Sequence, residues 1–137
     1  MSFLLDTCVI GEFSKARPSE RVLTFLLSVP QEQLHISVLT LGEMQKGIHR
    51  VTDKEKKDRL HEGYKQLRED YLAQTVAIDA PIAEVWGRLL AESERTLPAI
   101  DSLLAATALA KGYTLVTRNE KDFEGTGVAI INPWKQG

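Results

Sequence analysis

The chain has little of what defines several common protein classes. Its single cysteine, Cys8, excludes an internal disulfide and a cysteine-rich zinc site, and it suits a reducing cytoplasm. No run approaches the roughly 18 uninterrupted apolar residues of a membrane span, and the opening residues, which turn acidic at Asp6, do not resemble a secretory signal. Charge is nearly balanced, with 17 basic and 19 acidic side chains and a net charge of −2, so the chain does not bind nucleic acid simply as a polycation. We therefore expect a cytoplasmic protein without a membrane segment.

What is present is the composition of an ordinary globular protein. Of its 137 residues, 43% are hydrophobic and 26% are charged, which predicts one domain over residues 1–137. Short apolar runs alternate with helical patterns, which predicts an α/β fold with a mostly parallel central sheet and helices on both faces. The predicted strands cover residues 3–5, 34–36, 75–78, 113–117 and 128–131. The predicted helices follow Asp6, cover residues 19–29, begin at Ser37 and at Asp79, and run from Pro98 to Gly112.

The one compositional shift lies between Arg50 and Asp70, where seven basic and six acidic residues mix with few apolar ones. The apolar residues there recur at helical spacing, at Leu60, Tyr64, Leu67 and Tyr71. This pattern predicts a charged helical hairpin at about residues 50–73, with one narrow apolar stripe on a solvated helix.

Five acidic residues directly follow a predicted strand or lie in the helix or turn after it: Asp6, Glu43, Asp79, Asp101 and Asp122. They are candidate site residues, because ligands of open parallel sheets gather at the carboxyl ends of the strands. Each also has a structural explanation, as a helix cap, as an anion in a first helical turn or as a polar turn residue. At Asp79 the following Ala80-Pro81 favours a simple cap.

Periodicity gives the least support to Glu43. On a helix that begins at Ser37, the apolar stripe consists of Val38, Leu41 and Ile48. Glu43 points away from that stripe, so the pattern alone predicts a solvent-facing residue.

Carboxylates that converge within a few ångströms repel one another, and some take up protons unless a cation neutralises them. The natural partner is a hard, oxygen-preferring ion such as Mg²⁺ or Mn²⁺, which keeps several waters and favours phosphate substrates. If these acids converge, phosphodiester hydrolysis is the expected chemistry.

Several short motifs follow one another through nearly the whole chain. They are LLDTCVI at 4–10, SVLTLGE at 37–43 with GI at 47–48, LPAID at 97–101 leading into LLAATAL, TRN at 117–119, DF at 122–123 and INPW at 131–134. In this order and spacing the chain resembles the PIN-domain nucleases, and among them the VapC-type ribonuclease toxins of bacterial type II toxin–antitoxin systems. The resemblance implies a PIN-like fold.

The resemblance also implies an acidic metal pocket for Mg²⁺ or Mn²⁺, formed by Asp6, Glu43, Asp101 and Asp122. Asp6 and Asp101 would be direct ligands, while Glu43 and Asp122 would complete the pocket directly, through water or at a second ion. Polar side chains would support it by hydrogen bonds, at Thr7, Ser37 and Asn119. One position departs from the family pattern: Asn often stands where this chain has Cys8, and a thiol is the poorer donor.

The implied activity is metal-dependent endonucleolytic cleavage of single-stranded or looped RNA by metal-activated water, leaving a 5′ phosphate. Basic residues must surround such an acidic pocket to admit RNA, and the candidates are Lys15, Arg17, Lys46, Arg88, Arg118 and Lys121. The implied partners are a cognate antitoxin, whose extended tail covers the active-site groove, and a second copy of the chain. The toxin–antitoxin hetero-oligomer would bind operator DNA through the antitoxin.

Three alternatives stand beside this interpretation. A metal-independent ribonuclease would need its acid and base from His35, His49 and His61, of which His35 lies in an apolar strand and is better explained as a packed histidine. A phosphoacceptor receiver domain normally has a pair of acids after its first strand, where this chain has Asp6 alone. A non-catalytic PIN protein could bind its antitoxin and act as co-repressor. Three further apolar residues, Phe13, Phe25 and Leu26, are expected in the core rather than at a partner surface.

Overall fold

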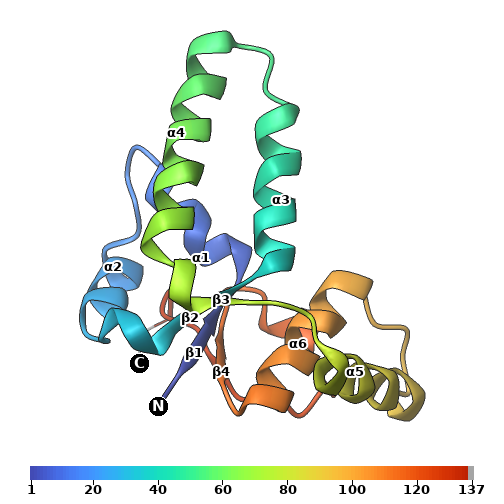
Figure 1. Ribbon diagram of the computed structural model, residues 1–137. Coiled ribbons are helices and arrows are strands. Elements are labelled where there is room, and N and C mark those ends of the chain that lie inside the picture. Colours follow the sequence, from blue (N-terminus) through green and yellow to red (C-terminus); the bar gives the residue numbers. More distant parts are fainter. Residues whose placement is uncertain (136–137) are drawn as a thin grey trace.

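The computed structural model describes residues 1–135, so the last two residues of the predicted 1–137 domain lie outside the described part. Its centre is a five-stranded sheet in the order β3-β2-β1-β4-β5, in which every pair of neighbouring strands is parallel (Figure 1). The strands are β1 (Phe3–Leu5), β2 (Leu34–Ser37), β3 (Thr75–Val76), β4 (Thr114–Val116) and β5 (Ile130–Ile131).

Helices connect these strands. They are α1 (Thr7–Gly11), α2 (Glu20–Leu27), α3 (Val38–His49), α4 (Lys54–Asp70), α5 (Ala80–Glu92) and α6 (Ala99–Lys111). Short 3₁₀ helices lie between them: η1 (Glu12–Ser14), η2 (Gln31–Gln33), η3 (Leu72–Gln74) and η4 (Glu120–Phe123). The predicted α/β class with a parallel sheet is confirmed. Several strands are shorter than predicted, and the predicted strands at 75–78 and 128–131 retain only two paired residues each.

The sheet is covered on both faces because successive strand side chains point to opposite sides. Phe3 and Leu5 pack in one apolar cluster with residues of α1, α2, α3 and α4. Leu4, between them, packs in a second cluster with Leu104 and Ala105 of α6. Figure 1 shows α5 and α6 together on this second side, away from the α3–α4 pair.

Local capping begins the helices where the sequence predicts. Asp6 accepts from the Thr7 N–H, Ser37 from the Leu39 N–H and Asp79 from the Ile82 N–H, so each satisfies a donor that a helix N-terminus leaves free. At the end of α6, Gly112 adopts a φ of 72°, a left-handed conformation that suits glycine. Because these strands are parallel, Asp6, which follows β1, and Ser37, which ends β2, lie at the same edge of the sheet.

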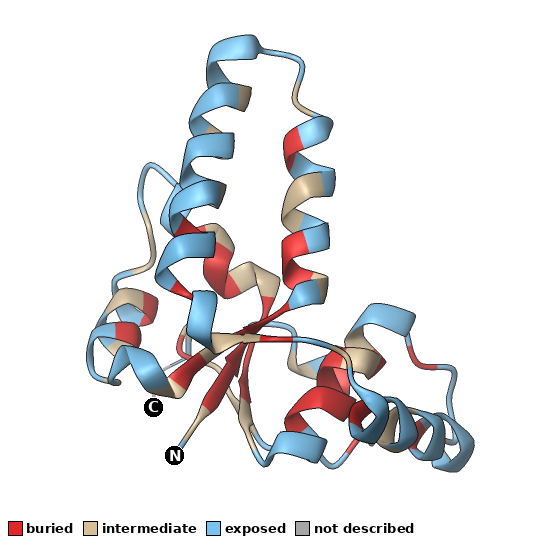
Figure 2. Cartoon of the chain, in the orientation of Figure 1, coloured by how far each residue is buried: buried red, intermediate tan, exposed pale blue. Residues whose placement is uncertain are grey.

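The charged segment folds mainly as α4, which lies beside α3 and projects from the sheet (Figure 1). Most of its surface is exposed, as the pale colouring in Figure 2 shows. Leu67 and Tyr71 are buried, while Leu60 and Tyr64 are partly buried, so the narrow apolar stripe is confirmed. No helix among residues 1–135 is long and apolar enough to cross a membrane.

Two expectations about packing are wrong. Phe13 is 51% exposed rather than in the core, because η1 places it at a groove, whereas Leu26 is buried and Phe25 packs partly buried against the core. Val38 is 37% exposed, and the buried face of α3 consists of Thr40, Leu41 and Ile48. Val38 is the first residue of α3, where the angle at which the helix leaves β2, rather than helical periodicity, decides which side chains face the core.

Candidate active site

Asp6 is buried at the junction of β1 and α1, with only 6% of its surface exposed. Its Oδ1 accepts the Thr7 N–H at 2.7 Å, and its Oδ2 accepts the Thr117 hydroxyl at 2.8 Å. Burial raises the pKa of this carboxyl, and these hydrogen bonds oppose the rise, because they favour the ionised form. The outcome is a raised pKa and a carboxylate held in one orientation.

Glu43 reaches the same place from α3. The Thr7 hydroxyl donates to Glu43 Oε1 at 2.6 Å, so Thr7 contacts Asp6 through its backbone and Glu43 through its side chain. Glu43 is exposed on its helix, as periodicity predicts, yet it faces the end of β1 rather than open solvent alone. Only the packing of α3 against α1 reveals this.

Asp101 lies in the first turn of α6, half-buried. Its pKa is raised to about 6, and burial is the largest cause. The negative charges of three other acids add to the rise, in the order Asp122, Asp6 and Glu43. Three carboxylates, one between β1 and α1, one in α3 and one in η4, therefore lie within electrostatic reach of Asp101 in α6. We call Asp6, Glu43, Asp101 and Asp122 the acidic cluster.

The remaining acid of the five, Asp79, belongs elsewhere. It caps α5 and pairs with Lys111 at 3.5 Å. Lys111 ends α6 and Asp101 lies near its start, about 15 Å apart along the helix at 1.5 Å per residue. The cap interpretation of Asp79 is confirmed.

The three proposed supporting residues differ in what they contact. Thr7 joins Asp6 and Glu43, as described. Ser37 is fully buried and fixes the start of α3, the helix that carries Glu43. Asn119 contributes its backbone, because its N–H donates to the Thr117 hydroxyl at 3.0 Å.

Thr117 is a site residue that the sequence-based search missed, since that search considered only ionisable residues at strand ends. Its hydroxyl donates to Asp6 and accepts from the Asn119 N–H. It follows β4 as Asp6 follows β1, and those strands are hydrogen-bonded neighbours. A search that also included uncharged polar residues at the last position of each predicted strand would have found it, because the predicted strand 113–117 ends at Thr117.

Cys8 keeps a weak contact where the family pattern often has Asn. Its Sγ lies 3.8 Å from Asp6 Oδ2 and 3.8 Å from Thr117 Oγ1. Burial raises the pKa of the thiol, so it stays protonated near neutral pH. The position therefore offers Asp6 a weak S–H donor and no additional charge.

The basic candidates are partly engaged with other groups. Lys15 pairs with Glu12 at 2.5 Å, and Glu12 is itself enclosed and accepts the Ser19 N–H. Arg118 lies over the Trp134 ring at 5.4 Å from its centroid. His35, by contrast, stacks on Tyr113 and contacts the Phe3 carbonyl, which confirms a packed structural role.

The donor set of the acidic cluster fits a hard divalent cation. Its oxygens are the ligands that Mg²⁺ and Mn²⁺ prefer. Burial and, after it, the neighbouring negative charges raise the pKa of Asp101, and a bound cation would offset both effects. Within residues 1–135, no three His, Cys, Asp or Glu side chains already form a ready-made ligand group. Mg²⁺ does not need one, because it commonly binds through one or two carboxylates and retains waters.

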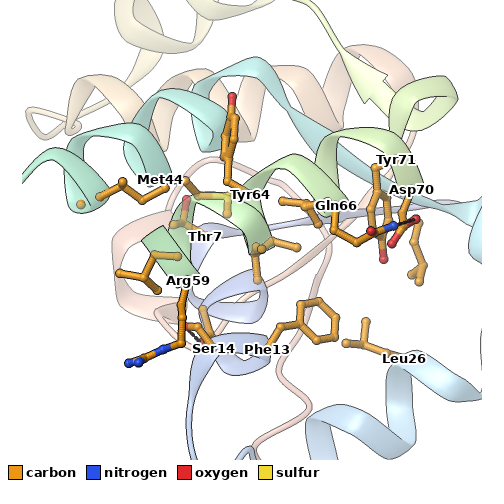
Figure 3. A pocket seen from close by; sticks show the side chains of 18 of the residues that line it. Thr7, Phe13, Ser14, Leu26, Met44, Arg59, Tyr64, Gln66, Asp70 and Tyr71 are labelled. Atoms are coloured by element: carbon orange, nitrogen blue, oxygen red, sulfur yellow. Dashed lines mark hydrogen bonds between the residues drawn. The ribbon is translucent and has the colours of Figure 1, made fainter. Parts of the chain in front are cut away.

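A groove of about 1060 Å³ extends from this region between the α3–α4 pair and the α1–η1–α2 segment (Figure 3). Thr7 is among its lining residues, so the groove reaches a residue that contacts the acidic cluster. The side chains that line it are mainly apolar, and the exposed residues Phe13 and Leu27 are among them.

Comparison with known proteins decides the family, because the PIN domain model matches residues 3–128. The chain belongs to the PIN domain family. It is 33% identical to the plasmid stability protein StbB of Pseudomonas syringae over 136 residues, which cover 96% of this chain and 98% of StbB. It is 31% identical to the toxin FitB of Neisseria gonorrhoeae, covering 96% and 97% of the two chains. It is 30% identical to the VapC ribonuclease Y4jK of Sinorhizobium fredii, again covering 96% and 97%.

The fold agrees with solved structures over nearly the whole chain. The crystal structure of FitAcB from Neisseria gonorrhoeae matches with a TM-score of 0.91 and 30% identity, covering 98% of this chain and 99% of that one. FitAB bound to an IR36 DNA fragment matches with a TM-score of 0.90. The resemblance drawn from the sequence motifs is confirmed at the level of family and fold.

Proposed function

We propose that this PIN-domain protein is the toxin of a type II toxin–antitoxin pair, a cytoplasmic endoribonuclease that depends on Mg²⁺ or Mn²⁺. The observation that carries the proposal is the acidic cluster, in which three acids from separate parts of the fold, Asp122, Asp6 and Glu43, act electrostatically on Asp101. Relatives named VapC ribonuclease and toxin FitB support the same activity class.

Asp6 and Asp101 would hold the ion directly, and Glu43 and Asp122 would bind it directly, through water or at a second ion. When bound, the ion supplies an activated water and stabilises charge on the phosphate of the RNA linkage. Three positioning hydrogen bonds belong to the chain itself. Thr117 and the Thr7 N–H donate to Asp6, which fixes its orientation and favours its ionised form, and the Thr7 hydroxyl orients Glu43. The product expected from water attack is a 5′ phosphate.

Among basic residues, Arg118 is the best placed to meet the RNA backbone. It is exposed and directly follows Thr117, the hydrogen-bond partner of Asp6. An arginine over an indole ring also presents a planar donor face beside an aromatic one, a combination suited to phosphate and base contacts.

The proposed partners are a cognate antitoxin and a second copy of the chain. FitB, the toxin relative, occurs in solved complexes named FitAcB and FitAB, and the latter is bound to DNA. We propose that the antitoxin tail occupies the apolar groove of Figure 3, where Phe13 and Leu27 would become buried. The resulting hetero-oligomer would bind operator DNA through the antitoxin.

The test uses induced expression and in vitro cleavage together. The wild-type chain should arrest growth and cleave RNA with Mg²⁺ or Mn²⁺, and excess EDTA should abolish cleavage. Asp6→Asn and Asp101→Asn should each remove both effects. Asp79→Asn is the matched control, since it makes the same chemical change in a cap far from the cluster and should behave as wild type.

Sequencing the 5′ ends of RNA after a short induction would locate the cut sites and give a substrate for kinetics. Cleavage that survives EDTA would refute the metal dependence. Growth arrest that persists in both cluster variants would show that catalysis is not the source of toxicity and would leave the co-repressor alternative.

A further inference from the structure

Arg95 makes an unusual set of contacts for an exposed residue in a loop between helices. Its Nη2 donates to the carbonyl oxygens of Glu124 at 2.9 Å, Asp122 at 3.1 Å and Lys121 at 3.4 Å. Its Nε donates to the Glu124 carbonyl at 3.3 Å. One guanidinium therefore joins the α5–α6 loop to the C-terminal end of η4, the short helix that carries Asp122.

The Lys121 carbonyl also accepts the Glu124 N–H at 3.3 Å, whereas Arg95 supplies the donor to the Asp122 and Glu124 carbonyls at this end of η4. A helix leaves its last carbonyl oxygens without partners, and a cation is favoured at that end. η4 has only four residues and no side-chain cap at its start. Arg95 thus acts as the C-terminal cap of η4, and a planar guanidinium suits this task because its donors fan out in fixed directions.

Arg95 is itself held in place. The Ser93 hydroxyl donates to the Arg95 carbonyl at 2.7 Å, and the Arg95 N–H donates back to Ser93 Oγ at 3.3 Å. Two residues further on, Leu97 is buried in the same apolar cluster as Phe123, the last residue of η4. The loop and η4 are therefore joined twice, by the Leu97–Phe123 cluster in the core and by the Arg95 guanidinium at the surface.

The same loop leads directly into the helix that carries Asp101. Residues 95–101 therefore position both acids: the backbone leads directly to Asp101, and the Arg95 side chain holds the η4 backbone that carries Asp122. α6 and η4 also pack against each other, so Asp122 lies beside the helix that carries Asp101.

We propose that Arg95 is a positioning residue of the active site, which sets Asp122 against Asp101 by capping η4. This inference rests on the proposed function. Arg95 touches neither substrate nor ion in this role, and its effect on cleavage passes through the backbone of Asp122. Misplacement of a reacting group by about 1 Å can cost on the order of 100-fold in rate, so loss of the cap should be visible in catalysis.

The test compares Arg95→Ala, Asp122→Asn and the double variant in single-turnover cleavage with excess protein, using the mapped RNA site. Arg95→Ala should slow cleavage by about 10- to 100-fold. The double variant should be no slower than Asp122→Asn alone, because both changes disable the same carboxylate. Arg95→Lys should recover part of the rate, and Arg68→Ala, which removes the cation in the last turn of α4, should match wild type.

A purely structural role would lower the melting temperature of Arg95→Ala while the folded protein kept its cleavage rate, and that result would overturn the inference. So would a double variant slowed by the product of the two single effects. If Arg95→Ala does not fold, Arg95→Gln, which removes the charge and the guanidinium donors but keeps a long side chain, takes its place in the same comparison, and a rate within twofold of wild type would then refute the role. Failure of the proposed function is distinguishable, because wild type itself would then show no cleavage that Asp101→Asn abolishes.

Discussion

Replacing Asp101 by Asn should stabilise the protein at neutral pH, although it removes a proposed metal ligand. The folded-state pKa of Asp101 is raised from 3.8 to about 6, so holding it ionised at pH 7 opposes folding. A shift of about two units corresponds to roughly 3 kcal/mol without screening. Asp101 is only half-buried and the N-terminus of α6 favours an anion, so we expect a net gain of about 1 kcal/mol.

The stability of the wild type and that of Asp101→Asn should depend differently on pH. Between about pH 4 and 6 the folded wild type binds more protons at Asp101 than the unfolded chain, so its stability falls as pH rises through this range. The amide that replaces this carboxyl in the variant does not titrate. The stability advantage of Asp101→Asn should therefore be largest above pH 7 and vanish near pH 4.

Urea unfolding at a series of pH values, with EDTA present to keep metal away, measures this difference. A gain of about 1 kcal/mol corresponds to a rise in melting temperature of roughly 3–4 °C for a chain of this size. Glu55→Gln is the matched control, because Glu55 is an acid in the first turn of α4, outside the cluster, and its loss should be neutral or slightly destabilising. If Asp101→Asn were no more stable than wild type at pH 7.5, or if its advantage persisted unchanged at pH 4, the electrostatic reasoning would be refuted.

Two further predictions concern the same cluster. Thr117→Val should lower the free energy of unfolding by about 1–3 kcal/mol in urea titrations, because it removes the side-chain donor to the buried Asp6 carboxyl. Thr117→Ser keeps a hydroxyl and should retain most of the wild-type stability. An equal loss in both variants would contradict the hydrogen-bond argument. Mn²⁺ added without RNA should raise the melting temperature of wild type, because an ion that binds only the folded state stabilises it. At a free Mn²⁺ concentration of 100 times the dissociation constant, the free energy of unfolding should rise by about 2.7 kcal/mol. The shift should disappear in a chain carrying both Asp6→Asn and Asp101→Asn, and a persistent shift would place the ion elsewhere.

The order of strands and helices follows from local features of the sequence. Alternating apolar runs and helical patterns, with Asp6, Ser37, Asp79 and Gly112 at helix ends, specify the elements, because capping and a left-handed glycine depend on neighbouring residues alone. Exposed fractions at element boundaries are less predictable, as Val38 and Phe13 illustrate, since they depend on the angle between a helix and the sheet.

The acidic cluster shows more clearly how far local sequence patterns can predict the site. The strand-end rule proposes five acids and does not separate Asp79, a cap, from Asp6, which belongs to the cluster. The Ala80-Pro81 that follows Asp79 favoured a cap there, and the family resemblance selected the other four acids, because motifs carry tertiary information that periodicity lacks. Glu43 illustrates the same limit, since the helical pattern assigns it to the solvent face and only α1 packed against α3 brings it to Thr7.

By itself, the sequence determined the parallel α/β architecture and the family, since both are encoded in short-range patterns and in the order of motifs along the chain. Only the tertiary structure decided which side chains meet. Thr117 and Asp6 are 111 positions apart and Arg95 reaches carbonyls 26 to 29 positions away, and no local rule relates residues at such separations. Those contacts arise from the parallel register of β1 with β4 and from the packing of the α5–α6 loop on η4, which form when the whole core is assembled.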